Sequence, residues 1–454
     1  MRKAGRMTNI WLSTKCSANT FAVLIGIVIG ICSGFCSWLL KFMISGLTHL
    51  LTSGLQLAGG NWIFLILPLL GILLTVAYQK YIAVRDIEHG TEQIERRLKT
   101  GQYHLSSKMI YAPMIASTLT LGFGGSAGSE GPIATTSAGI GSVVGRLFHM
   151  NDTQLRTMIG IGAGAGIAGI FKAPVGGALF TIEVLMIELT TLSVIVLVIS
   201  CIASSMTAYV LSGYSYDIMV TSPVSFNASI LPWVLIFGVL CGIYSLYYSI
   251  IMERLRRFFE SRKNIWLRAL LSGGLLSIFV FLFPTLYGEG YNSITDLLNG
   301  GKNILTDESI FYAARNNPWI VLALICGLLL VKPAAACSSN SGGGVAGDFA
   351  PTLFAGGILG FLFAISINII FDTNLTTAGF AYIGMAGIMA GAVRAPLMAI
   401  FLTAEMCDGY QFFLALMIAS TISYCIVEYV GYIRKRKILS KNTGSNQAKP
   451  FQAN

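Results

Sequence analysis

The sequence predicts an all-α polytopic membrane protein made of two related halves, and three observations lead to this fold class. First, 54% of the 454 residues are apolar and only 11% are charged, with a mean hydropathy of +0.72. Twenty acids and 30 bases are too few to cover the surface of a soluble protein of this size. The composition therefore excludes an ordinary soluble enzyme, a disordered chain and a nucleic-acid-binding module, and it requires a bilayer as solvent.

The second observation is that the apolar stretches are numerous and often short. They lie near 18–45, 62–79, 109–124, 133–148, 157–171, 174–212, 229–252, 266–286, 318–332, 351–371, 378–392, 396–404 and 410–433. Several are shorter than the roughly 20 residues that a spanning helix needs. Many of the 50 glycines interrupt these stretches, which predicts discontinuous helices around a site in the middle of the membrane.

The third observation is a recurring pattern. Lys172-Ala173-Pro174 precedes Glu183, and Arg394-Ala395-Pro396 precedes Glu405, with nine residues from Pro to Glu in both cases. Glycine-rich segments precede both patterns. We therefore expect a basic N-terminal segment 1–17, a first membrane repeat 18–215, a second membrane repeat 216–433 and a polar tail 434–454.

Charge predicts the orientation. Basic residues cluster at the N-terminus, in the 253–268 loop and in the tail, whereas the 213–228 loop has neither Lys nor Arg. The positive-inside rule then places both termini in the cytoplasm of a multi-pass cell membrane, with the bacterial inner membrane as the expected location. This distribution explains the net charge of +10 without nucleic acid, although a specific anionic partner is an alternative. The nine cysteines form no disulfide or zinc pattern, so neither a metal nor a cofactor is expected.

Two glycine-rich segments carry the candidate chemistry. One runs from Gly124 to Pro132 and includes Glu130; the other runs from Gly342 to Pro351. Proline suits the first turn of a helix, and such a helix start offers unpaired N–H donors and a partial positive charge. Two helix starts, one from each half, would hold an anion without a buried full charge. Glu130 is then a candidate gate or proton carrier, because intramembrane acids are rare and usually functional; a plain N-cap acid is the alternative.

Other polar residues have two interpretations each. Glu183 and Glu405 suit a structural role such as capping a neighbouring loop, with transport as the alternative. Lys172 and Arg394 either attract anions into a vestibule or mark a membrane interface. His89, in the polar 85–95 stretch, lies either in a solvated loop or beside the anion.

Two glycine-containing patterns are similar to those of enzymes. Gly124-Gly125-Ser126-Ala127-Gly128 fits the G-x-S-x-G pattern of serine hydrolases, but that pattern needs a strand-turn-helix context and a His partner. Gly160–Gly169 contains nucleotide-binding-like spacings, but no strand precedes it, so close helix packing is the better interpretation. We therefore expect no enzyme.

These motifs resemble the CLC family of chloride channels and chloride/proton antiporters. Gly128-Ser129-Glu130-Gly131-Pro132 resembles the family's G-[RK]-E-G-P motif, and Gly347-Asp348-Phe349-Ala350-Pro351 resembles its G-x-F-x-P motif. The paired Ala-Pro segments and Asp408-Gly409-Tyr410-Gln411 are also similar. The resemblance covers nearly the whole chain, at the length of a bacterial member without regulatory (CBS) domains.

The resemblance implies an antiparallel inverted repeat of about eighteen helices, many of them short or re-entrant. It implies homodimers with one anion pathway in each subunit and Glu130 as the gate. Backbone N–H groups in the two motifs would line the anion sites, which gives the expected anion-binding residues Gly128, Ser129, Gly131, Gly347, Asp348 and Phe349.

Three departures from the family pattern affect the expected function. His89 aligns with the family's anion-contacting serine. This replacement puts the usual preference for chloride in doubt, with bicarbonate, nitrate or fluoride as the alternative anions. Val184 stands where antiporters carry the internal proton-transfer glutamate, which favours channel-like or weakly proton-coupled transport over strict anion/proton exchange. The family's pore tyrosine has no clean match, and Tyr432 is the nearest tyrosine.

Overall fold

The computed structural model describes residues 18–446 apart from 54–61, 84–89, 188–189, 215–217, 219–225, 300–310 and 312–317. Within this part of the chain there are sixteen α-helices, a few short 3-10 and π-helical turns and no β-strand. The all-α prediction is therefore confirmed. His89 lies outside the described residues.

The first half begins with a 35-residue helix that packs against the last helix of the same half. Its helices are α2 (Ala18–Thr52), α3 (Leu67–Tyr81), α4 (Gly90–Lys99), α5 (Ala112–Gly122), α6 (Glu130–Leu147), α7 (Asp152–Phe171), α8 (Pro174–Leu179) and α9 (Thr191–Leu211). The 174–212 stretch is not one helix, because α8 ends in a π-helical turn at Phe180–Val184 before α9 begins.

The second half is joined to the first by the 30-residue helix α10. Its helices are α10 (Leu231–Glu260), α11 (Ile265–Leu282), α12 (Tyr291–Leu298), α13 (Pro318–Ser341), α14 (Phe349–Phe371), α15 (Thr377–Val393), α16 (Pro396–Met406) and α17 (Phe413–Asn446). α17 continues well beyond residue 433, so the apolar helix and the start of the basic tail form one element.

Eight helices in the described part of the chain are long and apolar enough to cross a membrane. Their outward faces are apolar: on α9, for example, Ile195 is 48% exposed, Ile202 47% and Met206 57%. Apolar side chains with that exposure would destabilise a soluble protein surface but suit contact with lipid. The fold is therefore that of a polytopic membrane protein.

The repeat is visible in the backbone as well as in the sequence. Gly124 has φ +102° and Gly343 has φ +109°, each six residues before the first residue of its helix, α6 or α14. Both positions lie in the left-handed half of φ space, which favours glycine. Lys172 and Arg394 end α7 and α15 with nearly equal left-handed φ values of 55° and 63°. The two halves thus adopt the same local conformations at matching residues.

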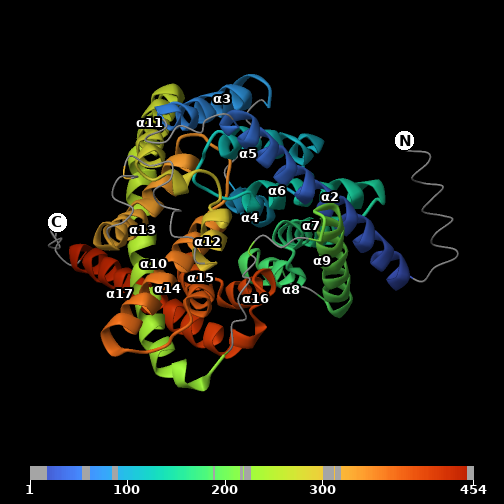
Figure 1. The fold of residues 1–454 in the computed structure, drawn as a ribbon. Coiled ribbons are helices and arrows are strands. Elements are labelled where there is room, and N and C mark those ends of the chain that lie inside the picture. Colours follow the sequence, from blue (N-terminus) through green and yellow to red (C-terminus); the bar gives the residue numbers. More distant parts are fainter. Residues whose placement is uncertain are drawn as a thin grey trace, which may run out of the picture.

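The two halves also cap each other's helices (Figure 1, where α8 and α16 lie side by side at the centre). The Glu183 carboxylate accepts hydrogen bonds from the N–H groups of Leu397 and Met398 at the start of α16 (3.2 and 2.8 Å). The Glu405 carboxylate accepts from Val175 and Gly176 at the start of α8 (3.0 and 2.8 Å). This exchange supports the structural interpretation of both glutamates, since a helix start has unpaired N–H groups that need acceptors.

Candidate functional site

The two glycine-rich segments meet in the middle of the protein. Gly128 N–H donates to the Gly347 carbonyl (2.9 Å), and Gly347 N–H donates to the Gly128 carbonyl (2.6 Å), in an antiparallel bridge. A Cβ on Gly347 would meet the Glu130 carboxylate and lie 2.8 Å from Gly131 N. Glycine is therefore required for the backbones to approach this closely. The start of α6 and the start of α14 are brought together as the sequence predicts.

Glu130 binds the start of the helix in the opposite half. Its Oε1 accepts hydrogen bonds from Phe349 N–H (2.5 Å) and Ala350 N–H (3.2 Å) at the start of α14. The residue is 1% exposed, and within the described residues its Oε2 has no hydrogen-bond partner. A carboxylate thus occupies the place at α14 where the helix dipole and free N–H groups would attract an anion.

Ser129, at the start of α6, also binds a carboxylate. Its N–H and its Oγ–H both donate to Oε1 of Glu289 (2.8 and 2.5 Å), which follows α11 along the chain. Sequence reasoning missed Glu289. The available signal was an acid between two glycines in an otherwise apolar region.

A buried cation lies beside these groups. Lys332 of α13 is 0% exposed; its Nζ donates to Ser126 Oγ (2.9 Å) and lies 4.5 Å from the centre of the Phe354 ring. Its charge interacts with both Glu130 and Glu289. Sequence reasoning missed Lys332 too, although a basic residue at the end of an apolar run is a recognisable signal of an intramembrane charge.

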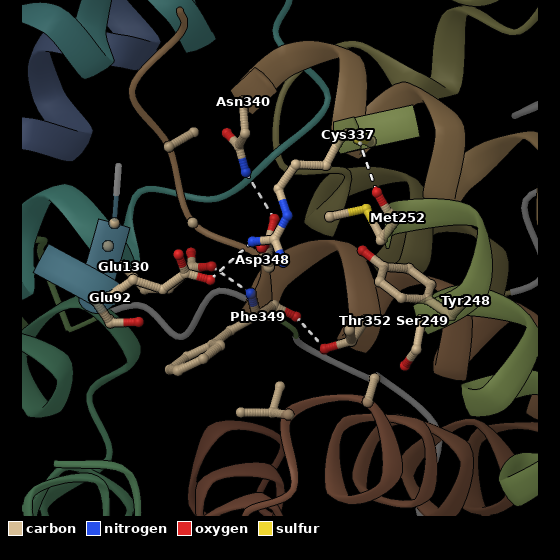
Figure 2. A pocket seen from close by; sticks show the side chains of 18 of the residues that line it. Glu92, Glu130, Tyr248, Ser249, Met252, Cys337, Asn340, Asp348, Phe349 and Thr352 are labelled. Carbon is tan, nitrogen blue, oxygen red and sulfur yellow. Dashed lines mark hydrogen bonds and ion pairs between the residues drawn. The ribbon is translucent and has the colours of Figure 1, made fainter. Parts of the chain in front are cut away.

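A cavity of about 530 Å³ reaches Glu130 from the end of α10. Figure 2 shows Glu130, Asp348 and Phe349 at its centre, with Tyr248 on the facing wall. The walls come from the first turns of α4 and α6, the segment that leads into α14 and its first turn, the second half of α10, the ends of α13 and α15, and the π-helical turn after α8. The lining residues are Gly90, Thr91, Glu92, Glu95, Glu130, Gly131, Val184, Tyr248, Ser249, Met252, Glu253, Arg256, Glu260, Cys337, Asn340, Ser341, Ala346, Gly347, Asp348, Phe349, Thr352, Ala392, Val393 and Arg394.

Acids outnumber bases in the lining. Two arginines, Arg256 and Arg394, face six acids: Glu92, Glu95, Glu130, Glu253, Glu260 and Asp348. Arg256 forms an ion pair with Glu92 (3.1 Å) that joins α10 to α4 at the cavity wall, and the Asp348 carboxylate accepts from Asn340 (2.6 Å). An excess of negative charge opposes anion entry, so this lining favours cations and protons over anions.

Tyr248 lines the cavity, whereas Tyr432 has no place on its wall. Tyr248 is 3% exposed and, among the described residues, its hydroxyl has no hydrogen-bond partner; Figure 2 shows the hydroxyl turned towards Asp348 and Phe349. Tyr432 is 61% exposed on α17 and is not a lining residue. The tyrosine that faces the site therefore comes from α10, a position that sequence alignment did not indicate.

Most of the predicted site residues lie together at the two helix starts, whereas Ser126 is buried away from the cavity. Gly128, Ser129, Glu130, Gly131, Gly347, Asp348 and Phe349 are brought together by the two helix starts. Ser126, the candidate nucleophile of the hydrolase alternative, is 0% exposed, bonded to Lys332 and absent from the cavity lining. The structure therefore gives that alternative no accessible nucleophile.

Comparisons with known proteins agree with this architecture. A family model described as voltage gated chloride channel matches residues 70–428. The voltage-gated ClC-type chloride channel ClcB of Shigella flexneri is 28% identical over 377 residues, covering 81% of this chain and 84% of that protein. The H(+)/Cl(−) exchange transporter ClcA of Vibrio cholerae is 28% identical over 323 residues, covering 68% of this chain and 64% of that protein. The crystal structure of a slow cyanobacterial Cl−/H+ antiporter matches with a TM-score of 0.74 at 23% identity, covering 93% of this chain and 99% of that one.

Proposed function

The chain belongs to the voltage-gated chloride channel family, and on that basis we propose that it carries small anions across the membrane through a pathway that Glu130 opens and closes. The observation that carries this proposal is the position of the Glu130 carboxylate on the N–H groups of Phe349 and Ala350. A transported anion would bind the same donors, because a helix start attracts either anion for the same electrostatic reason.

Protonation provides the opening step. A neutral Glu130 carboxyl binds the start of α14 less strongly than a carboxylate, since hydrogen bonds to charged acceptors are the stronger ones. The side chain then leaves the N–H groups, and an anion takes its place. Anion flux is therefore expected to rise as the pH falls, because a larger fraction of Glu130 is then protonated.

The Tyr248 hydroxyl provides a second donor for the anion. It is buried at the cavity wall and lacks a partner among the described residues, and a buried hydroxyl without a partner is costly. An anion between Tyr248 and the start of α14 would accept from both. Chloride is the expected anion, with fluoride, nitrate and bicarbonate as alternatives.

The assembly and orientation follow from the family and from charge. Both helix starts of the site come from one chain, and we propose a homodimer in the bilayer with one anion pathway in each subunit. The basic ends of the chain and the basic segment after Glu253 support a cytoplasmic location for both termini and for the mouth of the cavity at the end of α10. The bacterial inner membrane is the proposed location.

Anion/proton exchange is the second candidate, and Asp348 favours it. Val184 lines the cavity but has no group that binds a proton. The Asp348 carboxylate lines the same cavity as Glu130 and directly precedes Phe349, to which Glu130 is bonded. Asp348 would accept protons from the cytoplasmic side and deliver them to Glu130, and the acidic cavity lining would concentrate protons there.

One liposome experiment tests both candidates. Purified protein in chloride-loaded liposomes should release chloride when a potassium ionophore is added, while an external electrode records pH. Chloride release without proton movement supports the channel-like pathway; coupled proton movement that Asp348→Asn reduces while chloride release continues supports exchange through Asp348. Absence of efflux for chloride, fluoride, nitrate and bicarbonate alike would refute anion transport.

A further inference from the structure

Each of the two helix starts at the centre of the protein holds a carboxylate from another segment. At α14 the occupant is Glu130, and at α6 the occupant is Glu289, which binds both the N–H and the hydroxyl of Ser129. Ser129 is 1% exposed, so this is a buried pair of donors rather than a surface contact. The same physical argument applies to both places: a side chain that caps such a helix start occupies a position where an anion would be stabilised.

Glu289 reaches this position from outside the cavity. The cavity lies at the end of α10, and α11, with 18 residues, carries the chain about 27 Å away from that end before Glu289. Glu289 is not a lining residue and is half-buried, whereas Glu130 is 1% exposed. Glu289 is thus the outer carboxylate and Glu130 the inner one.

The residues on both sides of Glu289 have positive φ values, so the backbone bends at this point. Gly288 and Gly290 have φ values of +73° and +86°, which favour glycine on both sides of the glutamate. A Cβ on Gly288 would meet nothing within 4 Å, whereas a Cβ on Gly290 would meet the Phe354 ring. The segment is therefore packed at one end and has open space at the other, where the side chain would move.

Lys332 is a buried basic residue whose charged form both carboxylates, Glu289 and Glu130, attract. Its Nζ lies over the Phe354 ring, 4.5 Å from the ring centre, and donates to the Ser126 hydroxyl. A buried lysine keeps its charge only with negative charge nearby. Departure of Glu289 would remove one of its two negative neighbours, and an anion from the outer solution would restore the balance.

We propose that Glu289 is a second gating group, in series with Glu130, which an incoming monovalent anion must displace from Ser129 before it reaches the start of α14. Lys332 is the positioning residue. Because its buried charge needs a negative neighbour, the incoming anion replaces the Glu289 carboxylate when that carboxylate leaves Ser129. The inference rests on the proposed anion transport and extends it to the outer end of the same pathway.

The test compares chloride efflux from liposomes for wild-type protein, Glu289→Gln, Glu289→Asp, Glu130→Gln and the double variant Glu130→Gln/Glu289→Gln. Removal of a carboxylate from a helix start should raise efflux about fivefold in Glu289→Gln. Glu289→Asp keeps the charge but is one methylene too short to cap Ser129, so it should be as fast as Glu289→Gln. The double variant should exceed Glu130→Gln alone, because two gates in series both limit the flux.

Asp296→Asn is the matched control. It removes one acid from the exposed face of α12, seven residues along the chain, and should leave efflux at the wild-type rate. Two results would overturn the capping role of Glu289. One is that Glu289→Gln has the same efflux as wild type; the other is that Glu289→Gln is fast while Glu289→Asp has the wild-type rate. Absence of efflux in the wild-type protein would instead refute the proposed transport itself. Gel filtration in detergent establishes that each variant is folded, and if Glu289→Gln is not, Glu289→Asp and Ser129→Ala carry the same test.

Discussion

Replacement of Glu130 by glutamine is expected to raise anion efflux at neutral pH about tenfold or more and to remove most of its pH dependence. The wild-type carboxylate accepts two backbone hydrogen bonds at the start of α14, and a bond to a charged group contributes about 1.5–3 kcal/mol. Glutamine has a similar shape but no charge, so it competes with the anion less strongly. Since about 1.4 kcal/mol corresponds to a factor of ten, the loss of one such contribution gives the expected rise.

The pH profile of efflux distinguishes gating by Glu130 from a general effect of negative charge in the cavity. Wild-type efflux should increase as the pH falls and approach the rate of Glu130→Gln at low pH, because protonation makes the wild-type side chain neutral too. The measurement is chloride efflux from liposomes between pH 4.5 and 7.5. A Glu130→Gln profile that keeps the slope of the wild-type profile would remove Glu130 as the gate. Glu253→Gln, which changes an acid in the same cavity away from the helix start, is the control for a general loss of negative charge.

Loss of the exchanged caps is expected to have the largest effect on stability. Replacement of Glu183 by alanine leaves the N–H groups of Leu397 and Met398 without their carboxylate, and Glu405→Ala does the same to Val175 and Gly176. Each variant should lower the free energy of unfolding by about 1–2 kcal/mol, as loss of a helix cap does. Thermal unfolding in detergent measures the effect.

Glu428→Ala is the matched control for the caps. Glu428 forms a half-exposed ion pair with Arg394 at 3.5 Å, and such pairs contribute at most about 1 kcal/mol. The chloride efflux per folded Glu183→Ala molecule should equal that of wild type, because the glutamate acts on stability alone. A stable Glu183→Ala protein with altered efflux would instead assign Glu183 to transport.

Much of this architecture was predictable from composition, repeated spacings and short motifs. Composition predicted a membrane protein, the Pro-to-Glu spacing predicted two matching halves, and Gly-rich segments before proline predicted the helix starts. The glycine and proline signals act within a few residues: glycine at Gly124 and Gly343 supplies the positive φ, and proline suits the first turn of a helix. The left-handed residues Lys172 and Arg394 then adopt equal conformations because their surroundings repeat.

The features of the site that were not predicted depend on contacts between segments far apart in the sequence. Glu289 lies 160 residues from Ser129 along the chain, and Lys332 lies 206 residues from Ser126. Sequence spacing does not reveal such pairs, so neither residue was predicted. Tyr432 does not line the cavity for a related reason: choosing the nearest tyrosine considers one helix, whereas the tyrosine in the cavity wall is Tyr248 of α10. That Glu183 and Glu405 each cap a helix of the other half can likewise be seen only once the two halves are packed together.

The central claim is that Glu130 and the transported anion compete for the same place at the start of α14. The most direct measurement is the position of bromide, located by its anomalous scattering, in crystals of wild-type protein and of Glu130→Ala grown in the same bromide concentration. We expect bromide within hydrogen-bond distance of the N–H groups of Phe349 and Ala350 in Glu130→Ala and the Glu130 carboxylate there in the wild type. Bromide on these N–H groups in the wild type beside an unmoved Glu130, or no bromide there in Glu130→Ala, would contradict the account.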